Sequence, residues 1–262
     1  MLKLLKYEWK ACARTCLPLY GVLILMSLIS RMLYVIPKNA SLDFMLPAIG
    51  SMLYMGVMMA AFVVTAVILI QRFYKNLLGS EGYLMFTLPV TVSQHLFSKT
   101  IIAVVMIALS GIAAFLSIGI FADMSFGTLF VDMIKGVARS GGLLFGLELL
   151  VLAVLGIAGM ALFLYMCIAL GHLASRHRLL MSIVWYVVLS TALQVLMLMV
   201  MMGVGNAVPE PFVDLMKVWW SGITPMGAAH LMLRCCCVFA LISDAVYFLV
   251  TRWILVHKLN LE

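Results

Sequence analysis

The hydrophobic positions along this chain fall into six long runs, and most of the polar residues lie in the intervals between them. A transmembrane helix needs about 20 mostly apolar residues to cross about 30 Å of hydrocarbon. Each run meets this requirement, so the pattern predicts six membrane-spanning helices. They cover residues 17–36, 48–70, 100–121, 143–170, 180–202 and 231–253.

The composition agrees with this pattern, since 66% of the residues are hydrophobic and 10% are charged. A soluble domain is about half apolar and about a quarter charged. Even the longest intervals, residues 71–99 and 203–230, are too short for a soluble catalytic or nucleotide-binding domain. We therefore expect residues 1–262 to form a single all-α integral membrane domain. The six cysteines lack metal-site spacing, and no metal site is predicted.

Residues 1–16 have the pattern of a helix that lies in the membrane interface. One helical face carries apolar side chains and another carries basic ones, which is typical of an interfacial helix. Pro18 then marks the predicted turn into the first span. The apolar face consists of Leu2, Leu5, Trp9, Cys12 and Cys16, and the basic face of Lys3, Lys6, Lys10 and Arg14.

The distribution of Lys and Arg predicts the orientation, because these residues gather on the cytoplasmic side of membrane proteins. With a cytoplasmic N-terminus, eleven of the 17 cations lie inside and four outside. Both termini are therefore expected in the cytoplasm, and the net charge of +7 gives no reason to expect nucleic acid as a partner. The inside set is Lys3, Lys6, Lys10, Arg14, Arg72, Lys75, Lys99, Arg176, Arg178, Arg252 and Lys258; the outside set is Lys38, Lys135, Arg139 and Lys217.

Three ionisable residues within the spans are candidates for special roles, since charges in a membrane are rare and usually functional. Arg31 and Glu148 lie at similar depths near the outer ends of their spans and are predicted to form a structural ion pair. Asp244 lies near mid-bilayer with no cation at its depth. It is a candidate for the substrate path, and a buried structural hydrogen bond is the alternative.

The interval between the second and third runs has its own helix signals. No helix breaker occurs in residues 72–78, so the second helix is expected to continue into the cytosol and to end at Gly79. Pro89 ends the next short segment. Thr91 and Gln94 form a capping-box pattern, which predicts the start of the third long helix.

Residues 80–88 are unusually apolar for a cytoplasmic connection. If they protrude between two helix ends, their apolar side chains need lipid or another protein to cover them. An ordinary membrane-surface loop with aromatic residues at the headgroups is the simpler alternative. The apolar residues are Tyr83, Leu84, Met85, Phe86 and Leu88.

The segment RFYKNLLGSEGYLMFTLPVT, placed after the second of six spans, resembles the coupling segment of bacterial ATP-binding-cassette permeases of the type-2 (ABC-2) family. The N-terminal KYEWK is similar to the elbow helix of that family. The resemblance implies a cytoplasmic coupling helix within residues 71–99 that, with the elbow helix, contacts an ATPase subunit. Glu81 would be the acidic contact, and Tyr83 and Phe86 the apolar anchors. The implied interface residues are Glu8, Gly79, Glu81, Tyr83 and Phe86.

The resemblance further implies a second permease chain, homo- or heteromeric, and a multi-pass location in the bacterial cytoplasmic membrane. It also implies a re-entrant hairpin in residues 203–230, where an ordinary helix on the outer leaflet is an equal alternative. The chain has no G-x-x-x-x-G-K-[ST] motif, so ATP and Mg²⁺ would be bound by the partner P-loop ATPase and this chain would need no cofactor.

The predicted function is therefore the membrane-spanning permease subunit of an ABC exporter, which is not itself an enzyme. A non-transporting membrane scaffold or sensor is the main alternative. An intramembrane enzyme is less well supported, because the spans contain no pair of acids, paired histidines or nucleophile–base set.

Overall fold

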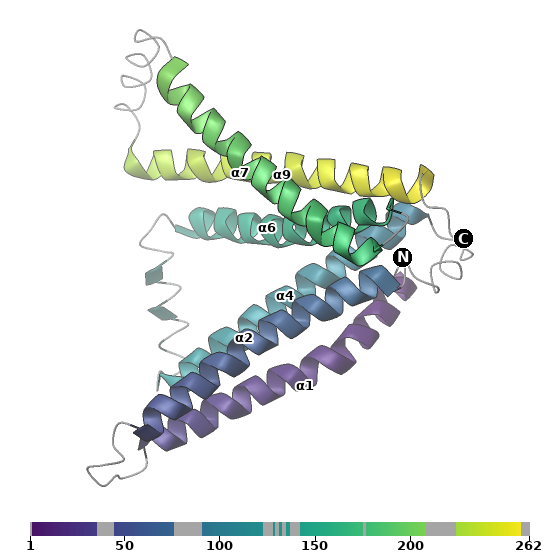
Figure 1. The fold of residues 1–262 in the computed structure, drawn as a ribbon. Helices are drawn as coiled ribbons and strands as arrows, with labels where there is room; N and C mark the ends of the chain where they lie inside the picture. The colour runs from purple at the N-terminus through teal and green to yellow at the C-terminus, as the bar shows by residue number, and fades with distance from the viewer. Residues whose placement is uncertain are drawn as a thin grey trace. The chain divides into compact units, whose positions relative to one another are not determined.

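A computed structural model describes residues 2–35, 45–75, 91–122, 128, 131–132, 135–136, 142–174, 177–207 and 224–257. The described residues contain six long helices and no strands, which confirms the all-α class (Figure 1). All six are long and apolar enough to cross a membrane. The helices are α1 (Leu2–Val35), α2 (Met45–Phe73), α4 (Val92–Phe121), α6 (Gly142–Gly171), α7 (Arg178–Ala207) and α9 (Pro225–His257).

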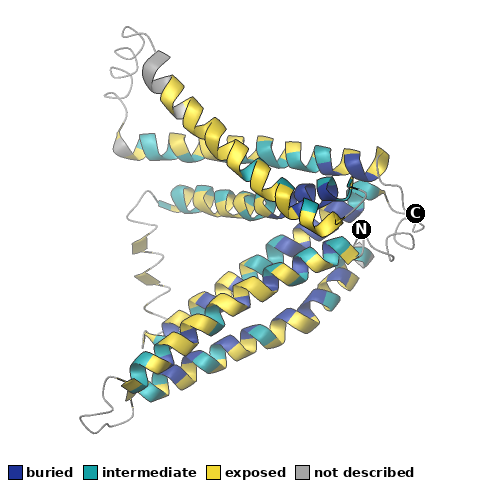
Figure 2. Ribbon diagram, viewed as in Figure 1, coloured by how far each residue is buried: buried dark blue, intermediate teal, exposed yellow. Residues whose placement is uncertain are grey.

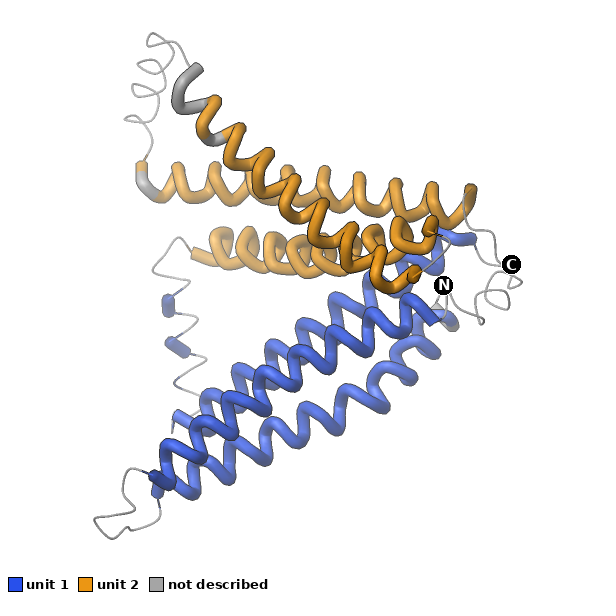
Figure 3. The backbone as a smooth tube through the Cα atoms, viewed as in Figure 1, with its two compact units in different colours: residues 1–136 blue, residues 137–262 orange. Residues whose placement is uncertain are grey.

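The chain divides into two compact units (Figure 3). Unit 1 comprises residues 1–136 and contains α1, α2 and α4. Unit 2 comprises residues 137–262 and contains α6, α7 and α9. The sequence predicted one domain and did not mark the interval of residues 122–141, between the two sets of helices, as a boundary.

The first helix differs from the prediction. α1 continues through Pro18 without the expected turn, and its 34 residues extend for about 51 Å. This length exceeds the thickness of the hydrocarbon layer, so part of α1 lies beyond a single span. Cys12 and Cys16 of the predicted apolar face are fully buried within the protein, whereas Trp9 is 37% exposed. The part of that face formed by Cys12 and Cys16 therefore packs against protein.

Each helix of unit 1 buries one stripe of side chains. In the second half of α4 the buried positions lie on one face, and most of them from Ser110 onward are Ala or Ser. Small residues let membrane helices approach closely. Figure 2 shows buried residues along one side of α1 and exposed residues along the other. The buried stripe of α1 is Glu8, Cys12, Cys16, Tyr20, Leu23, Ser27 and Ser30.

In unit 2, α6 packs against both α7 and α9. The C-terminal third of α6 is largely buried, whereas α7 is exposed over most of its length (Figure 2). Apolar exposed surface of this kind is what a membrane helix presents to lipid or to a partner within the membrane.

The helix ends refine the predicted boundaries. Thr91 accepts from the Gln94 backbone N–H, and the Gln94 side chain accepts from the Thr91 N–H, which confirms the capping box. α9 begins at Pro225, six residues before the prediction, because Thr224 caps it through a 3.2 Å hydrogen bond from the Gly227 N–H. Pro at the first helical position is favourable, since its missing N–H would have no partner there.

Candidate functional site

A buried cluster of three charged residues joins the helices of unit 1. The Lys99 ammonium donates to Glu8 Oε1 at 2.8 Å, and Arg72 Nη1 donates to Glu8 Oε2 at 3.5 Å. The side chains of Glu8 and Lys99 are only 7% and 4% exposed, and that of Arg72 is 28% exposed. A buried carboxylate is tolerated because two cations share its two oxygens.

The cluster lies at the two helix ends that border the chain between α2 and α4. Arg72 lies one residue before the end of α2, and Lys99 lies in the second turn of α4. These two helices flank residues 76–90, the middle part of the predicted coupling segment 71–99. Within unit 1, Glu8 therefore binds both α2, which precedes residues 76–90, and α4, which follows them.

Glu8 has its partners inside unit 1. Its carboxylate is buried, and both of its oxygens are paired with side chains of the same unit. The charge on Glu8 is used to hold α1 against α2 and α4. Its predicted role at an ATPase interface stays a prediction.

The other predicted interface residues are Gly79, Glu81, Tyr83 and Phe86, and they lie outside the described residues. Their predicted roles stay predictions. Of the segment 71–99, the structure describes the end of α2, residues 74–75, and the chain from Thr91 onward.

Further polar contacts continue along the interior of unit 1. The Tyr20 hydroxyl donates to the Met106 carbonyl at 3.0 Å and lies 3.3 Å from Thr65 Oγ1. The Tyr54 hydroxyl lies 2.8 Å from Ser117 Oγ. Each hydroxyl is buried together with its partner, which is what an apolar surrounding requires of a polar group. These contacts connect α1, α2 and α4 and serve the stability of the unit.

Arg31 and Glu148 each have partners within their own units. Arg31 Nη1 donates to the Ile120 carbonyl at 3.4 Å, near the C-terminus of α4, where a cation is favoured by the helix dipole. Glu148 is held by two residues of α9. The predicted pair of Arg31 with Glu148 joins different units and stays a prediction.

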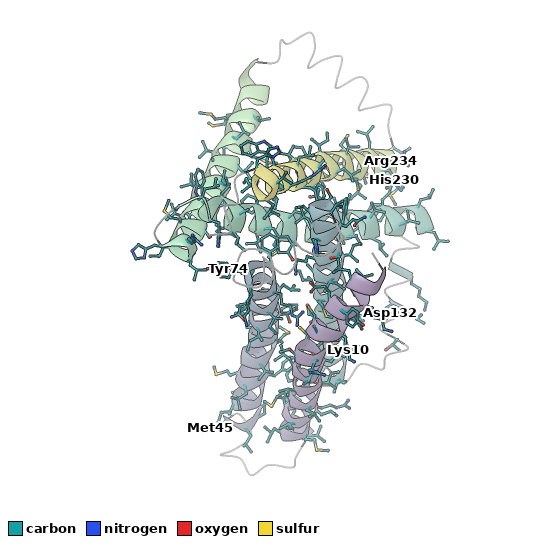
Figure 4. The ribbon with its side chains drawn as sticks, turned by 90° about the vertical axis from the view of Figure 1, so that its right-hand side faces the viewer. Lys10, Met45, Tyr74, Asp132, His230 and Arg234 are labelled. Atoms are coloured by element: carbon teal, nitrogen blue, oxygen red, sulfur yellow. The ribbon has the colours of Figure 1, made fainter. Side chains whose placement is uncertain are left out.

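The Glu148 carboxylate is clamped by side chains one turn apart on α9. Its Oε2 lies 2.6 Å from His230 Nδ1, and its Oε1 accepts from Arg234 Nε at 2.8 Å. Figure 4 shows His230 and Arg234 close together on α9. The Phe145 ring also meets the His230 ring edge-on at 5.7 Å. This clamp fastens the first turns of α9 to α6.

The clamp makes a testable prediction about local stability. Replacing Glu148 with alanine removes both polar contacts, so the first turns of α9 should open more often. Backbone hydrogen exchange should become faster over residues 226–234 and remain unchanged over residues 250–257. The control is Leu149→Ala, because Leu149 is 46% exposed and makes no such contact. Equal exchange in the Glu148 and Leu149 variants would contradict a clamping role.

Asp244 occupies the middle part of α9, 19 residues after its start and 13 before its end. Its Oδ1 fills the place where a Cβ at Gly159 of α6 would lie. Within the described chain, Asp244 makes no hydrogen bond or ion pair, and neither Ser nor Thr serves as its partner. The structure thus gives no support, among these residues, to the alternative of a structural hydrogen bond.

Sequence reasoning missed the partners of two of these acids. Lys99 and Arg72 were recognised only as cytoplasmic cations, and His230 was not recognised at all. The available signal for Glu148 was the spacing of His230 and Arg234, four residues apart on one helix face. For Glu8, the signal was the presence of cations near the predicted cytoplasmic ends of three helices.

The described part of the chain contains no group of three His, Cys, Asp or Glu side chains that could hold a metal ion. Six apolar helices joined by internal polar clusters define an α-helical multi-pass membrane protein. Comparison with protein-family models, with curated proteins and with solved structures found no match to the chain.

Proposed function

We propose that this protein is the membrane-spanning permease subunit of an exporter driven by a separate P-loop ATPase. The proposal rests on the resemblance of RFYKNLLGSEGYLMFTLPVT to the ABC-2 coupling segment and on the six membrane helices. It places the chain in the bacterial cytoplasmic membrane, paired with a second permease chain. ATP and Mg²⁺ would bind to the ATPase, because this chain lacks a phosphate-binding loop.

The observation that carries the proposal is the buried cluster of Glu8, Arg72 and Lys99. A permease driven from outside must transmit movement of its cytoplasmic segment to its membrane helices. The cluster ties α1 to the two helices that flank residues 76–90. A displacement of that segment would therefore move three helices together, which a loosely attached surface loop would not do.

The coupling segment is the part of the proposal to test first. Tyr83 and Phe86 would be apolar anchors in a groove of the ATPase, and Glu81 would meet its cations. Replacing Tyr83 and Phe86 together with alanine should weaken the complex by about 2 kcal/mol or more, as the loss of buried aromatic anchors does. Insertion into the membrane should not change, since both residues lie outside the spans.

The measurement uses the tagged permease, co-expressed with the P-loop ATPase that we expect to be encoded by a neighbouring gene. Recovery of the ATPase should fall with Tyr83→Ala/Phe86→Ala and should be retained with Phe239→Ala. Phe239 is a suitable control because it is a 68% exposed aromatic on α9, within a membrane span. Equal recovery of the ATPase with all three proteins, together with unchanged ATP hydrolysis, would mean that residues 80–88 are a membrane-surface loop.

A further inference from the structure

Asp244 differs from the other acids of the six helices. These helices contain three acidic residues, and Glu8 and Glu148 each bind two basic side chains. Asp244 has no such partner among the described residues. A carboxylate in the middle of a membrane helix is energetically costly unless a cation or a proton neutralises it. Asp244 therefore lacks the basic partner side chains that Glu8 and Glu148 have.

The surroundings of Asp244 show how α6 makes room for it. A Cβ at Gly159 would overlap Asp244 Oδ1, so the carboxylate in its present position lies where a larger residue would place its side chain. The side chain is nevertheless only partly buried. The carboxylate thus lies close to the backbone of α6 and is partly exposed.

Three aromatic rings lie on the adjoining turns of the same unit. The Phe163 ring on α6 meets the Tyr247 ring on α9 at 5.4 Å and the Tyr186 ring on α7 at 5.7 Å, at interplanar angles of 61° and 60°. Phe163 follows Gly159 by one helical turn, and Tyr247 follows Asp244 by nearly one turn. Residues three or four apart share a helix face. The contact of Phe163 with Tyr247 therefore lies about one helical turn from the contact of Gly159 with Asp244, along the same interface of α6 with α9.

We propose that Asp244 and the rings of Phe163, Tyr186 and Tyr247 form a binding site for a lipophilic organic cation. The carboxylate supplies the negative charge that such a cation needs in a membrane. The rings supply apolar contact and the attraction of aromatic faces for a positive charge. If the proposed export function holds, this site assigns the substrate class as hydrophobic amines, quaternary ammonium or phosphonium compounds.

The order of these groups along the helices suits entry from the cytoplasmic side. Tyr247 lies ten residues before the end of α9 and Phe163 eight before the end of α6, which correspond to about 15 Å and about 12 Å. Asp244 lies 13 residues before the end of α9, or about 20 Å. In the orientation predicted by the positive-inside pattern, a cation would meet the rings first and the carboxylate afterwards.

Ca²⁺ and Mg²⁺ fit the site poorly. Ca²⁺ binds six to eight oxygen ligands and Mg²⁺ requires octahedral coordination. The described residues offer no group of three His, Cys, Asp or Glu side chains at Asp244. One carboxylate beside three aromatic rings instead matches a large cation with dispersed charge and an apolar surface.

Two probes of equal shape and opposite charge test the proposal. The full-length protein in lipid nanodiscs is titrated with tetraphenylphosphonium and, separately, with tetraphenylborate, and the uptake of empty nanodiscs is subtracted. We expect saturable binding of tetraphenylphosphonium alone. Absence of saturable tetraphenylphosphonium binding, or equal binding of the borate, would overturn the proposal.

Substitutions then test whether tetraphenylphosphonium binds at Asp244 and the aromatic rings. Asp244→Asn keeps the shape and removes the charge, and it should weaken binding about tenfold or more. Tyr247→Leu should weaken it about threefold to thirtyfold. The matched controls, Asp132→Asn and Phe239→Leu, remove a charge and a ring elsewhere and should bind as the wild type does. Asp244→Glu should retain part of the affinity, which guards against a loss caused only by misfolding.

Unchanged binding by Asp244→Asn would overturn the assignment. The binding experiment needs no ATPase, so it stands apart from the test of export. Binding that depends on Asp244 without any ATP-driven transport would uphold the site and refute the exporter. Transport of other compounds without tetraphenylphosphonium binding would uphold the exporter and refute the site.

Discussion

Replacing Glu8 with glutamine should lower the free energy of unfolding by about 3–5 kcal/mol, the usual effect of removing one member of a buried ion pair. The physical reason is the charge left behind. The Lys99 side chain is 4% exposed and lies 2.8 Å from Glu8, so the variant would keep a buried ammonium group without its counter-charge. Arg72 is 28% exposed and can turn toward water or headgroups.

A double variant separates this explanation from general damage to the helix. Glu8→Gln combined with Lys99→Met removes both charges and should recover much of the stability lost by Glu8→Gln alone. Such non-additivity is expected of residues that contact one another or share one ion-pair network. Lys10→Gln is the single-charge control, because Lys10 is exposed on the same helix and its removal should change stability by less than about 0.5 kcal/mol.

The measurement is denaturant-induced unfolding of the purified protein in detergent micelles, followed by circular dichroism. The order of stability should be wild type and Lys10→Gln, then the double variant, then Glu8→Gln. If Glu8→Gln and Lys10→Gln unfold at the same denaturant concentration, the cluster does not stabilise unit 1.

Replacing Gly171 with alanine should lower the free energy of unfolding by about 3 kcal/mol, toward the upper end of the range for overpacking. A Cβ at this position would overlap Ser182 Oγ and would lie 2.5 Å and 2.6 Å from the backbone N and Cα of Ser182. Two of these atoms belong to the backbone of α7, so no change of side-chain rotamer relieves the overlap. The end of α6 and the start of α7 would have to separate.

Gly156 provides the matched control on the same helix. A Cβ there meets nothing within 4 Å, so Gly156→Ala should be neutral or slightly stabilising, since alanine is the better helix former. Unfolding of the two variants is compared in the same detergent. A difference below about 0.5 kcal/mol would contradict the close approach of α6 to α7 at Ser182.

The positions of the long helices could be predicted because they depend on local properties of the chain. A run of apolar residues long enough to cross the membrane satisfies its own backbone hydrogen bonds only as a helix. All six predicted spans lie almost entirely within observed helices. The start of α4 was equally local, since Thr91 and Gln94 carry the complete capping signal in four residues.

Where prediction failed, the reason was tertiary contact. Pro18 was expected to mark a turn between an interfacial helix and the first span. In the structure α1 continues through it, and Cys12, Cys16 and Tyr20 on both sides of the proline are buried on one face. Packing of a whole helix face can outweigh the local effect of one proline.

The sequence by itself determined the class of this protein, its six helices and the presence of charged residues within them, because composition and periodicity act along the chain. Only the tertiary structure decided what each of those charges does. The sequence alone did not show the partners of Glu8 or Glu148, and each is paired with residues more than 60 positions away. The carboxylate of Asp244 lies beside Gly159, and no basic side chain of the described residues is paired with it. Depth along a helix can be counted from sequence, but the neighbour across the helix interface depends on rotation and packing, which only the folded units fix.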